Sequence, residues 1–143
     1  ETSPSAGIPD TSTCMNCHAQ VWNETPALAP VRAAWFSGAP ILWQRVHRLP
    51  DHVYFDHAIH VNKGVGCVTC HGRVDLMARV EMVTDLSMGW CLDCHRAPAS
   101  RLRPRARVTD MTWRPAGDPV ALGEALIRQY DIRTRTNCTT CHR

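Results

Sequence analysis

The stretch FDHAIHVNKGVGCVTCHG, residues 55–72, contains a Cys-x-x-Cys pair that is followed at once by a histidine. The three residues are Cys67, Cys70 and His71. A pair with this spacing is compatible with a zinc site, a redox-active dithiol or a covalently bound cofactor. The other cysteines of the chain decide among these possibilities.

The same Cys-x-x-Cys-His motif occurs four times and accounts for all eight cysteines of the 143-residue chain. The copies are CMNCH (Cys14, Cys17, His18), CVTCH (Cys67, Cys70, His71), CLDCH (Cys91, Cys94, His95) and CTTCH (Cys138, Cys141, His142). This is the attachment signature of c-type haem, in which two thiols bind the vinyl groups and the histidine ligates the iron. The sequence therefore predicts four haem c groups, with eight cysteines as attachment points and four proximal histidines.

A zinc ribbon is the main alternative, because the two central cysteine pairs have a separation that suits a four-cysteine site. A ribbon does not require a histidine after every pair. Histidine makes up 8 of 143 residues, so four chance occurrences have a probability of about one in a hundred thousand. Zinc would also leave the first and last pairs in need of a second site. Disulfides and thioredoxin-like redox pairs are further alternatives.

Four histidines remain outside the motifs, one for each iron, and all lie in the segment VHRLPDHVYFDHAIH, residues 46–60. A low-spin electron-transfer haem needs a second strong axial ligand, usually imidazole or thioether sulfur. His57 and His60 follow Asp56, a predicted N-cap, on a short helix that Gly64 ends. With a spacing of three residues they share one flank of the helix but point at different angles, so that they can serve two different haems.

The other two histidines have less regular surroundings. Pro50 keeps the preceding segment from being helical, and His47 is predicted to be a further distal ligand. His52 lies in an extended HVYF segment, where it is a distal ligand, an exposed imidazole or an imidazole that binds a haem propionate. Met88 and Met111 are the thioether alternatives.

Longer blocks of the chain resemble one family. The blocks are STCMNCH (12–18), PILWQRVHRLPDHVYFDHAIHVNKGVGCVTCHG (40–72), LSMGWCLDCHR (86–96) and NCTTCHR (137–143). They are similar to the multihaem cytochrome c subunit of alternative complex III, the bacterial quinol:electron acceptor oxidoreductase. The Phe-x-His-x-x-His element also resembles small class III multihaem cytochromes. That subunit usually carries a fifth, N-terminal haem with its own His-x-x-His element, which this sequence lacks.

The resemblance implies an electron-relay subunit of a quinol-oxidising respiratory or photosynthetic membrane complex, bound to an iron–sulfur subunit and not itself an enzyme. It also implies that His57 caps the haem on Cys67 and Cys70, that His60 caps a neighbouring haem, and that His47 is a distal ligand. The alternatives are a free periplasmic or filament-forming carrier, and a multihaem reductase with one five-coordinate haem.

The predicted fold is a single tetrahaem cytochrome c domain over residues 1–143, mainly irregular, with short α-helices and a minor β-element. Only 6% of the residues are aromatic, so the haems are expected to supply much of the apolar core. Residues 1–13 are predicted to be an extended N-terminal segment, 27–37 and 118–130 helices, and 73–83 a strand.

No apolar run approaches the roughly 18 residues that cross a bilayer. The polar, proline-rich start ETSPSAGIPD predicts a mature or trimmed form. We expect a periplasmic or extracytoplasmic location, with membrane contact only through partners or a missing N-terminal segment. The segment RLRPRARV, residues 101–108, has no interleaved aromatic residues and does not predict nucleic-acid binding. It is either a solvated loop or a region that neutralises propionates or docks an acidic subunit.

Overall fold

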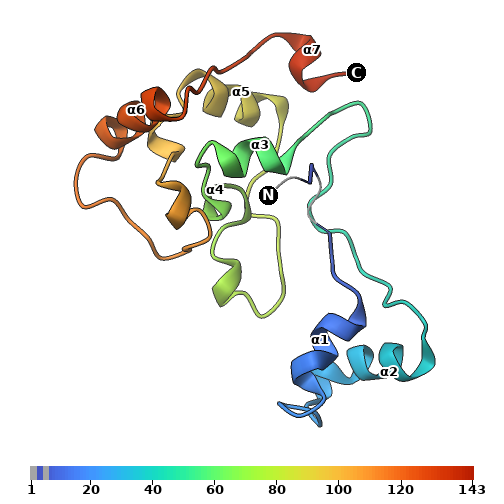
Figure 1. Ribbon diagram of the computed structural model, residues 1–143. Coiled ribbons are helices and arrows are strands. Elements are labelled where there is room, and N and C mark those ends of the chain that lie inside the picture. Colours follow the sequence, from blue (N-terminus) through green and yellow to red (C-terminus); the bar gives the residue numbers. More distant parts are fainter. Residues whose placement is uncertain (1–2, 5–6) are drawn as a thin grey trace. The chain divides into compact units, whose positions relative to one another are not determined.

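The computed structural model describes residues 3–4 and 7–143 (Figure 1). The chain forms two compact units. The larger unit consists of residues 46–143 together with residues 3–4, and the smaller consists of residues 7–45. The prediction of a single domain over residues 1–143 stays a prediction.

Both units are built from short helices that irregular segments connect. The smaller unit contains α1 (Thr11–His18), the 3₁₀-helix η1 (Pro26–Leu28) and α2 (Ala29–Ser37). The larger unit contains α3 (His57–Asn62), α4 (Cys67–His71), η2 (Val74–Leu76), α5 (Met88–Arg96), η3 (Ala99–Arg101), η4 (Arg105–Arg107), α6 (Pro119–Gln129) and α7 (Cys138–Cys141). Within the described part of the chain, β-structure is limited to two isolated antiparallel bridges. The predicted fold class, mainly irregular with short helices and minor β content, is confirmed.

Helix α3 begins and ends where the sequence predicts. The side chain of Asp56 accepts hydrogen bonds from the backbone N–H groups of Ala58, at 2.8 Å, and Ile59, at 3.3 Å. These bonds satisfy two of the N–H groups that the first turn of a helix leaves open. The helix ends before Gly64, whose φ of +83° is a left-handed conformation that suits glycine.

Helix α6 also matches its prediction, with Asp118 as N-cap and Pro119 in the first turn. It packs against η3 through Gly123, which is buried. An ideal Cβ atom at Gly123 would lie 1.8 Å from the carbonyl oxygen of Ala99. Only glycine, which has no side chain, allows α6 to lie this close to the backbone of Ala99. Leu126, one turn further along α6, is buried as well.

The predicted strand over residues 73–83 is wrong. The segment forms the single 3₁₀ turn η2 and then continues without regular structure. Its alternating apolar residues lack a partner strand, and Val80, Met82 and Val83 remain exposed. A period-2 pattern indicates a strand only where a second strand can complete the hydrogen bonds.

The N-terminal prediction also needs correction. The side chain of Asp10 accepts a hydrogen bond from the N–H of Thr13, and α1 begins at Thr11. The predicted extended segment therefore ends at Asp10, and residues 1–2 and 5–6 of it lie outside the described residues. The helix predicted over residues 27–37 is confirmed by α2.

The protein contributes little apolar core of its own. Among the described residues the buried hydrophobic side chains are Met15, Ala34, Leu102, Val108 and Leu126. Large apolar side chains such as Leu76 and Met88 are exposed. No helix of the described part has both the length and the apolar character needed to cross a membrane. A core this small leaves apolar surface for a large bound group to cover.

We predict that Gly123→Ala destabilises the folded holoprotein by about 1–3 kcal/mol, because the added methyl group overlaps the backbone at Ala99. Gly117→Ala is the matched control, because nothing lies within 4 Å of an ideal Cβ there. Thermal unfolding followed by circular dichroism measures both. Equal melting temperatures for the two variants would show that α6 does not depend on this approach.

Candidate haem-binding sites

Each Cys-x-x-Cys-His motif lies on or at the end of a short helix, namely α1, α4, α5 or α7. Residues three apart on a helix face the same side, so both thiols of a pair can reach one edge of a porphyrin. None of the eight cysteines is paired with another in a disulfide. Cys17 and Cys138 are exposed and the other six are half-buried.

The thiols of α4, α5 and α7 lie near one another in the larger unit. Burial raises the pKa of the Cys70 thiol to about 11, and the neighbouring Cys94, Cys91 and Cys67 act in the same direction. Burial, followed by the neighbouring Cys141, also raises the pKa of Cys91. The described residues nevertheless contain no group of three or more His, Cys, Asp or Glu side chains placed to hold a metal ion.

Histidines from the distal segment face the motif histidines at a characteristic spacing. A metal–imidazole bond of about 2 Å, with the ring centre about 1 Å behind the nitrogen, places two rings on one metal about 6 Å apart. The rings of His57 and His71 are 6.4 Å apart and within 11° of parallel. The rings of His60 and His95 are 6.1 Å apart at 55°. Both ring spacings are compatible with one iron between the two rings.

A third pair of histidine rings is brought together by backbone hydrogen bonds between two distant segments. Val53 and His142 form an antiparallel bridge, and the N–H of Tyr54 donates to the carbonyl of Cys141 at 2.7 Å. This pairing brings the rings of His52 and His142 to 5.6 Å, within 24° of parallel. The spacing favours the ligand interpretation of His52 over that of an isolated exposed imidazole.

Several imidazoles are held in the tautomer that a metal ligand needs. The Nδ1 atoms of three histidines lie within hydrogen-bond distance of backbone carbonyls: His18 with Val21 at 3.0 Å, His60 with Asp56 at 2.7 Å and His95 with Arg135 at 2.9 Å. A proton on Nδ1 leaves the lone pair on Nε2, which is the usual arrangement for a ligating histidine. Burial lowers the pKa of His60 and of His71, which favours the neutral, ligating form.

His47 differs from these pairs. Its ring centre is 4.4 Å from that of His71, at 74°, which is too close for two ligands on opposite sides of one iron. The Nε2 atom of His47 is buried and has no hydrogen-bond partner. An unsatisfied buried nitrogen is costly for a protein alone, and a metal ligand is one role that would satisfy it.

Two residues near the histidines had no role in the sequence-based interpretation. The ring of Phe55 lies 4.8 Å from that of His57 and 4.5 Å from that of His60, so it is next to both ligand candidates. Phe55 was part of the quoted Phe-x-His-x-x-His element, and that is the signal that could have found it. Arg103, within RLRPRARV, is buried, whereas the other three arginines of that segment are exposed.

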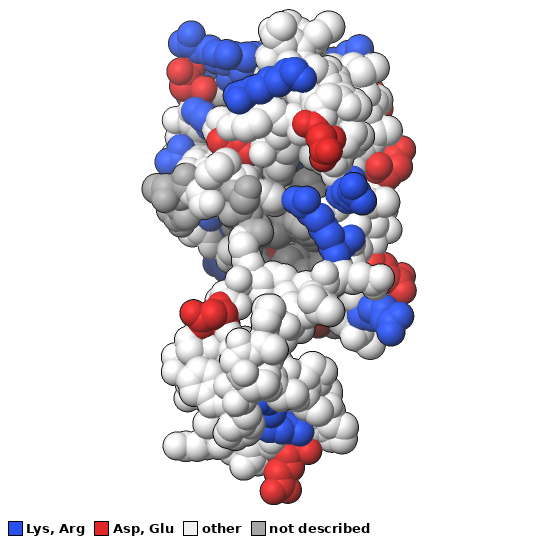
Figure 2. All heavy atoms as spheres, turned by 90° about the vertical axis from the view of Figure 1, so that its right-hand side faces the viewer, with Lys and Arg blue, Asp and Glu red and all other residues white. Residues whose placement is uncertain are grey.

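Charged residues are unevenly distributed (Figure 2). The unit that contains α1 and α2 is mostly uncharged in this view, whereas basic side chains gather over the larger unit. Residues 96–143 contain ten arginines but only four carboxylate side chains. Few of these arginines form ion pairs, such as Arg107 with Asp110 at 3.3 Å. The surplus of arginine side chains can bind carboxylates of haem propionates or of a partner protein.

Free thiols in Cys-x-x-Cys-His helices, facing imidazoles and a thin apolar core all fit covalently bound haem, and together they define a small multihaem c-type cytochrome. The chain belongs to the family of cytochrome c7 and related cytochromes c, which matches residues 53–143. A stretch of 67 residues is 37% identical to the multihaem cytochrome c subunit of menaquinone reductase from Nitratidesulfovibrio vulgaris, Hildenborough strain. This match covers 46% of the chain and 31% of the relative.

We predict that Asp56→Ala lowers the free energy of unfolding of the holoprotein by about 1 kcal/mol, because α3 loses its N-cap. Asp56→Asn, which keeps an acceptor oxygen, should stay within a few tenths of a kcal/mol of the parent protein. Guanidinium-induced unfolding measures both variants. If Asp56→Ala and Asp56→Asn unfold alike, the cap does not stabilise the helix that carries His57 and His60.

Proposed function

We propose that the chain carries four c-type haems, one on each cysteine pair, and that each iron has two histidine ligands. The proximal ligands are His18, His71, His95 and His142. The ring spacings support His57 opposite His71, His60 opposite His95 and His52 opposite His142. The buried, unsatisfied Nε2 supports His47 as the fourth distal ligand.

The function that these sites favour is electron transfer. Bound haem supplies a one-electron couple, and two protein ligands leave no open coordination position for a substrate. The protein's own residues fix the two imidazoles, and the Nδ1 contacts of His60 and His95 with backbone carbonyls hold their orientation. Ligands that keep their positions when the iron gains or loses an electron keep the reorganisation energy of electron transfer small.

We further propose that the chain relays electrons as an extracytoplasmic subunit of a membrane-bound oxidoreductase that exchanges electrons with quinones. The resemblance of residues 12–143 to the alternative complex III subunit supports a quinol-oxidising complex with an iron–sulfur subunit as partner. The similarity to a subunit of a menaquinone reductase also supports a quinone-linked complex. The four haems would then unite the chain into one tetrahaem domain.

A complex that reduces menaquinone is the second candidate. The name of the N. vulgaris relative favours it, although the match spans less than a third of that protein. The role of this chain would be the same relay, with electrons moving towards the quinone. A free periplasmic carrier remains the alternative outside any complex.

We predict that each of His52→Ala, His57→Ala and His60→Ala converts one of four low-spin haems to high spin, because one axial ligand is lost. Low-temperature electron paramagnetic resonance detects the change, and intact mass gives the haem count. Met88→Ala and Met111→Ala are the controls and should leave four low-spin haems. A high-spin signal in a methionine variant, or none in His52→Ala, would overturn the ligand assignment for that haem.

We expect the native protein to co-migrate with large membrane subunits after gentle solubilisation. Its haem staining and the iron–sulfur signal of the complex should elute together in size exclusion. Incubation with a quinol should reduce its haems in the complex but not in the separated subunit. Elution as a small red protein by itself would support the free carrier instead.

A further inference from the structure

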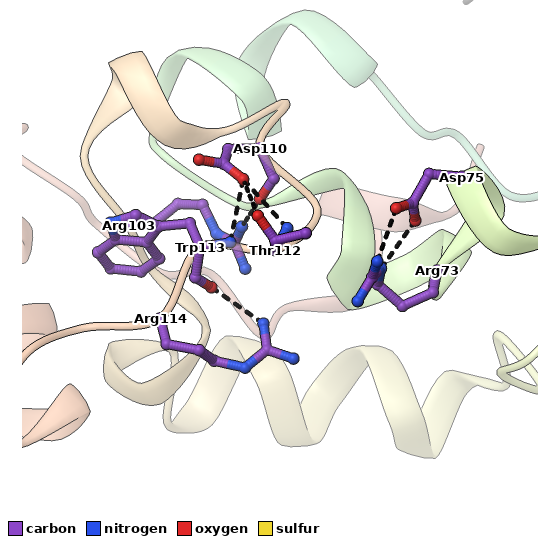
Figure 3. A network of polar contacts seen from close by, with 7 residues as sticks. All are labelled: Arg73, Asp75, Arg103, Asp110, Thr112, Trp113 and Arg114. Atoms are coloured by element: carbon purple, nitrogen blue, oxygen red, sulfur yellow. Dashed lines mark hydrogen bonds and ion pairs between the residues drawn. The ribbon is translucent and has the colours of Figure 1, made fainter.

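Arg103 is a buried cation, and no carboxylate among the described residues forms an ion pair with it. Its side chain is 7% exposed, and its Nε atom is buried without a hydrogen-bond partner. The Nη1 group donates to the carbonyl oxygens of Asp110, at 2.9 Å, and Arg107, at 3.4 Å. The carboxylate of Asp110 instead accepts from Thr112, Trp113 and Arg107. Figure 3 shows the guanidinium beside the Trp113 ring, 5.3 Å from its centre.

The buried guanidinium lies directly against the start of an attachment helix. An ideal Cβ atom at Gly66 would lie 2.2 Å from Nε and 2.4 Å from Cζ of Arg103. Gly66 is the N-cap of α4, and the next residue is Cys67. The N–H of Arg103 donates to the carbonyl of Gly64 at 2.9 Å. The N–H of Cys67 donates to the carbonyl of Val108 at 3.1 Å, which holds the two segments together.

Stability alone gives no reason for this arrangement. A buried charge without a counter-charge costs free energy, and burial lowers the pKa of Arg103 for the same reason. The neighbouring Arg114 adds repulsion of like charge. Carbonyl oxygens and an indole face stabilise the cation only in part. The nearby Asp110 offsets this cost only in part, so the buried positive charge is retained against a net cost.

We propose that Arg103 sets the reduction potential of the haem attached at Cys67 and Cys70, which it raises through its buried positive charge. This inference rests on the proposed function. Reduction adds one negative charge to a haem, so a fixed cation close to the attachment point favours the reduced form. Two charges about 10 Å apart at an effective dielectric constant of about 20 change an equilibrium constant about tenfold. Burial protects this effect from screening by salt.

Spectroelectrochemical titration of the holoprotein tests the proposal. In Arg103→Gln and Arg103→Met, one haem should become harder to reduce. Its reduced-to-oxidised ratio at a fixed potential should fall about tenfold, which corresponds to about 59 mV for a one-electron couple. Arg103→Lys, which keeps the charge, should stay close to the parent protein. Repeating Arg103→Gln in the His57→Ala background identifies the haem, because the high-spin haem should be the one that shifts.

Arg107→Gln is the matched control, because it removes an exposed, paired arginine from the same loop. Arg107→Gln should change the reduced-to-oxidised ratio of each haem at a fixed potential by less than about twofold. Unchanged potentials in both neutral variants, or equal shifts of all haems, would overturn the proposal. Loss of haem in both neutral variants but not in Arg103→Lys would also overturn it, because Arg103 would then be purely structural. The proposed function fails separately, if the parent protein itself contains fewer than four haems.

Discussion

The arrangement of the larger unit centres on three pairs of imidazole rings whose centres lie 5.6, 6.1 and 6.4 Å apart, close to the spacing that two ligands on opposite sides of one iron would need. In the larger unit, α3 provides His57 and His60 for motif histidines on two other helices. Residues 52–54 provide a third histidine through a backbone bridge. Helices α1, α3, α4, α5 and α7 carry the cysteines or the candidate histidines, whereas α2 and α6 carry neither.

Local signals in the sequence were sufficient to predict the elements that depend on neighbouring residues. The cap at Asp56, the start of α6 at Pro119 and the helical attachment motifs involve contacts within a few positions. The motif also predicts the cofactor class, which the cytochrome c7 family supports. These features could be predicted because capping hydrogen bonds and thioether spacing are properties of short peptides.

Long-range features could not be predicted in the same way. The strand expected over residues 73–83 failed, since the alternation of apolar residues does not say whether a partner strand exists. The proximity of His52 to His142 depends on a bridge between distant segments. The burial of Arg103 has no local signal, because exposed arginines flank it two positions away on either side. Its burial depends on Gly66 and Trp113, which lie elsewhere in the chain.

The bridge between residues 52–54 and 141–143 joins segments that most of the larger unit separates along the chain. Closing so long a loop is slow compared with forming a single helical turn. The segment that carries His52 and helix α7 are therefore expected to come together only after the local helices have formed.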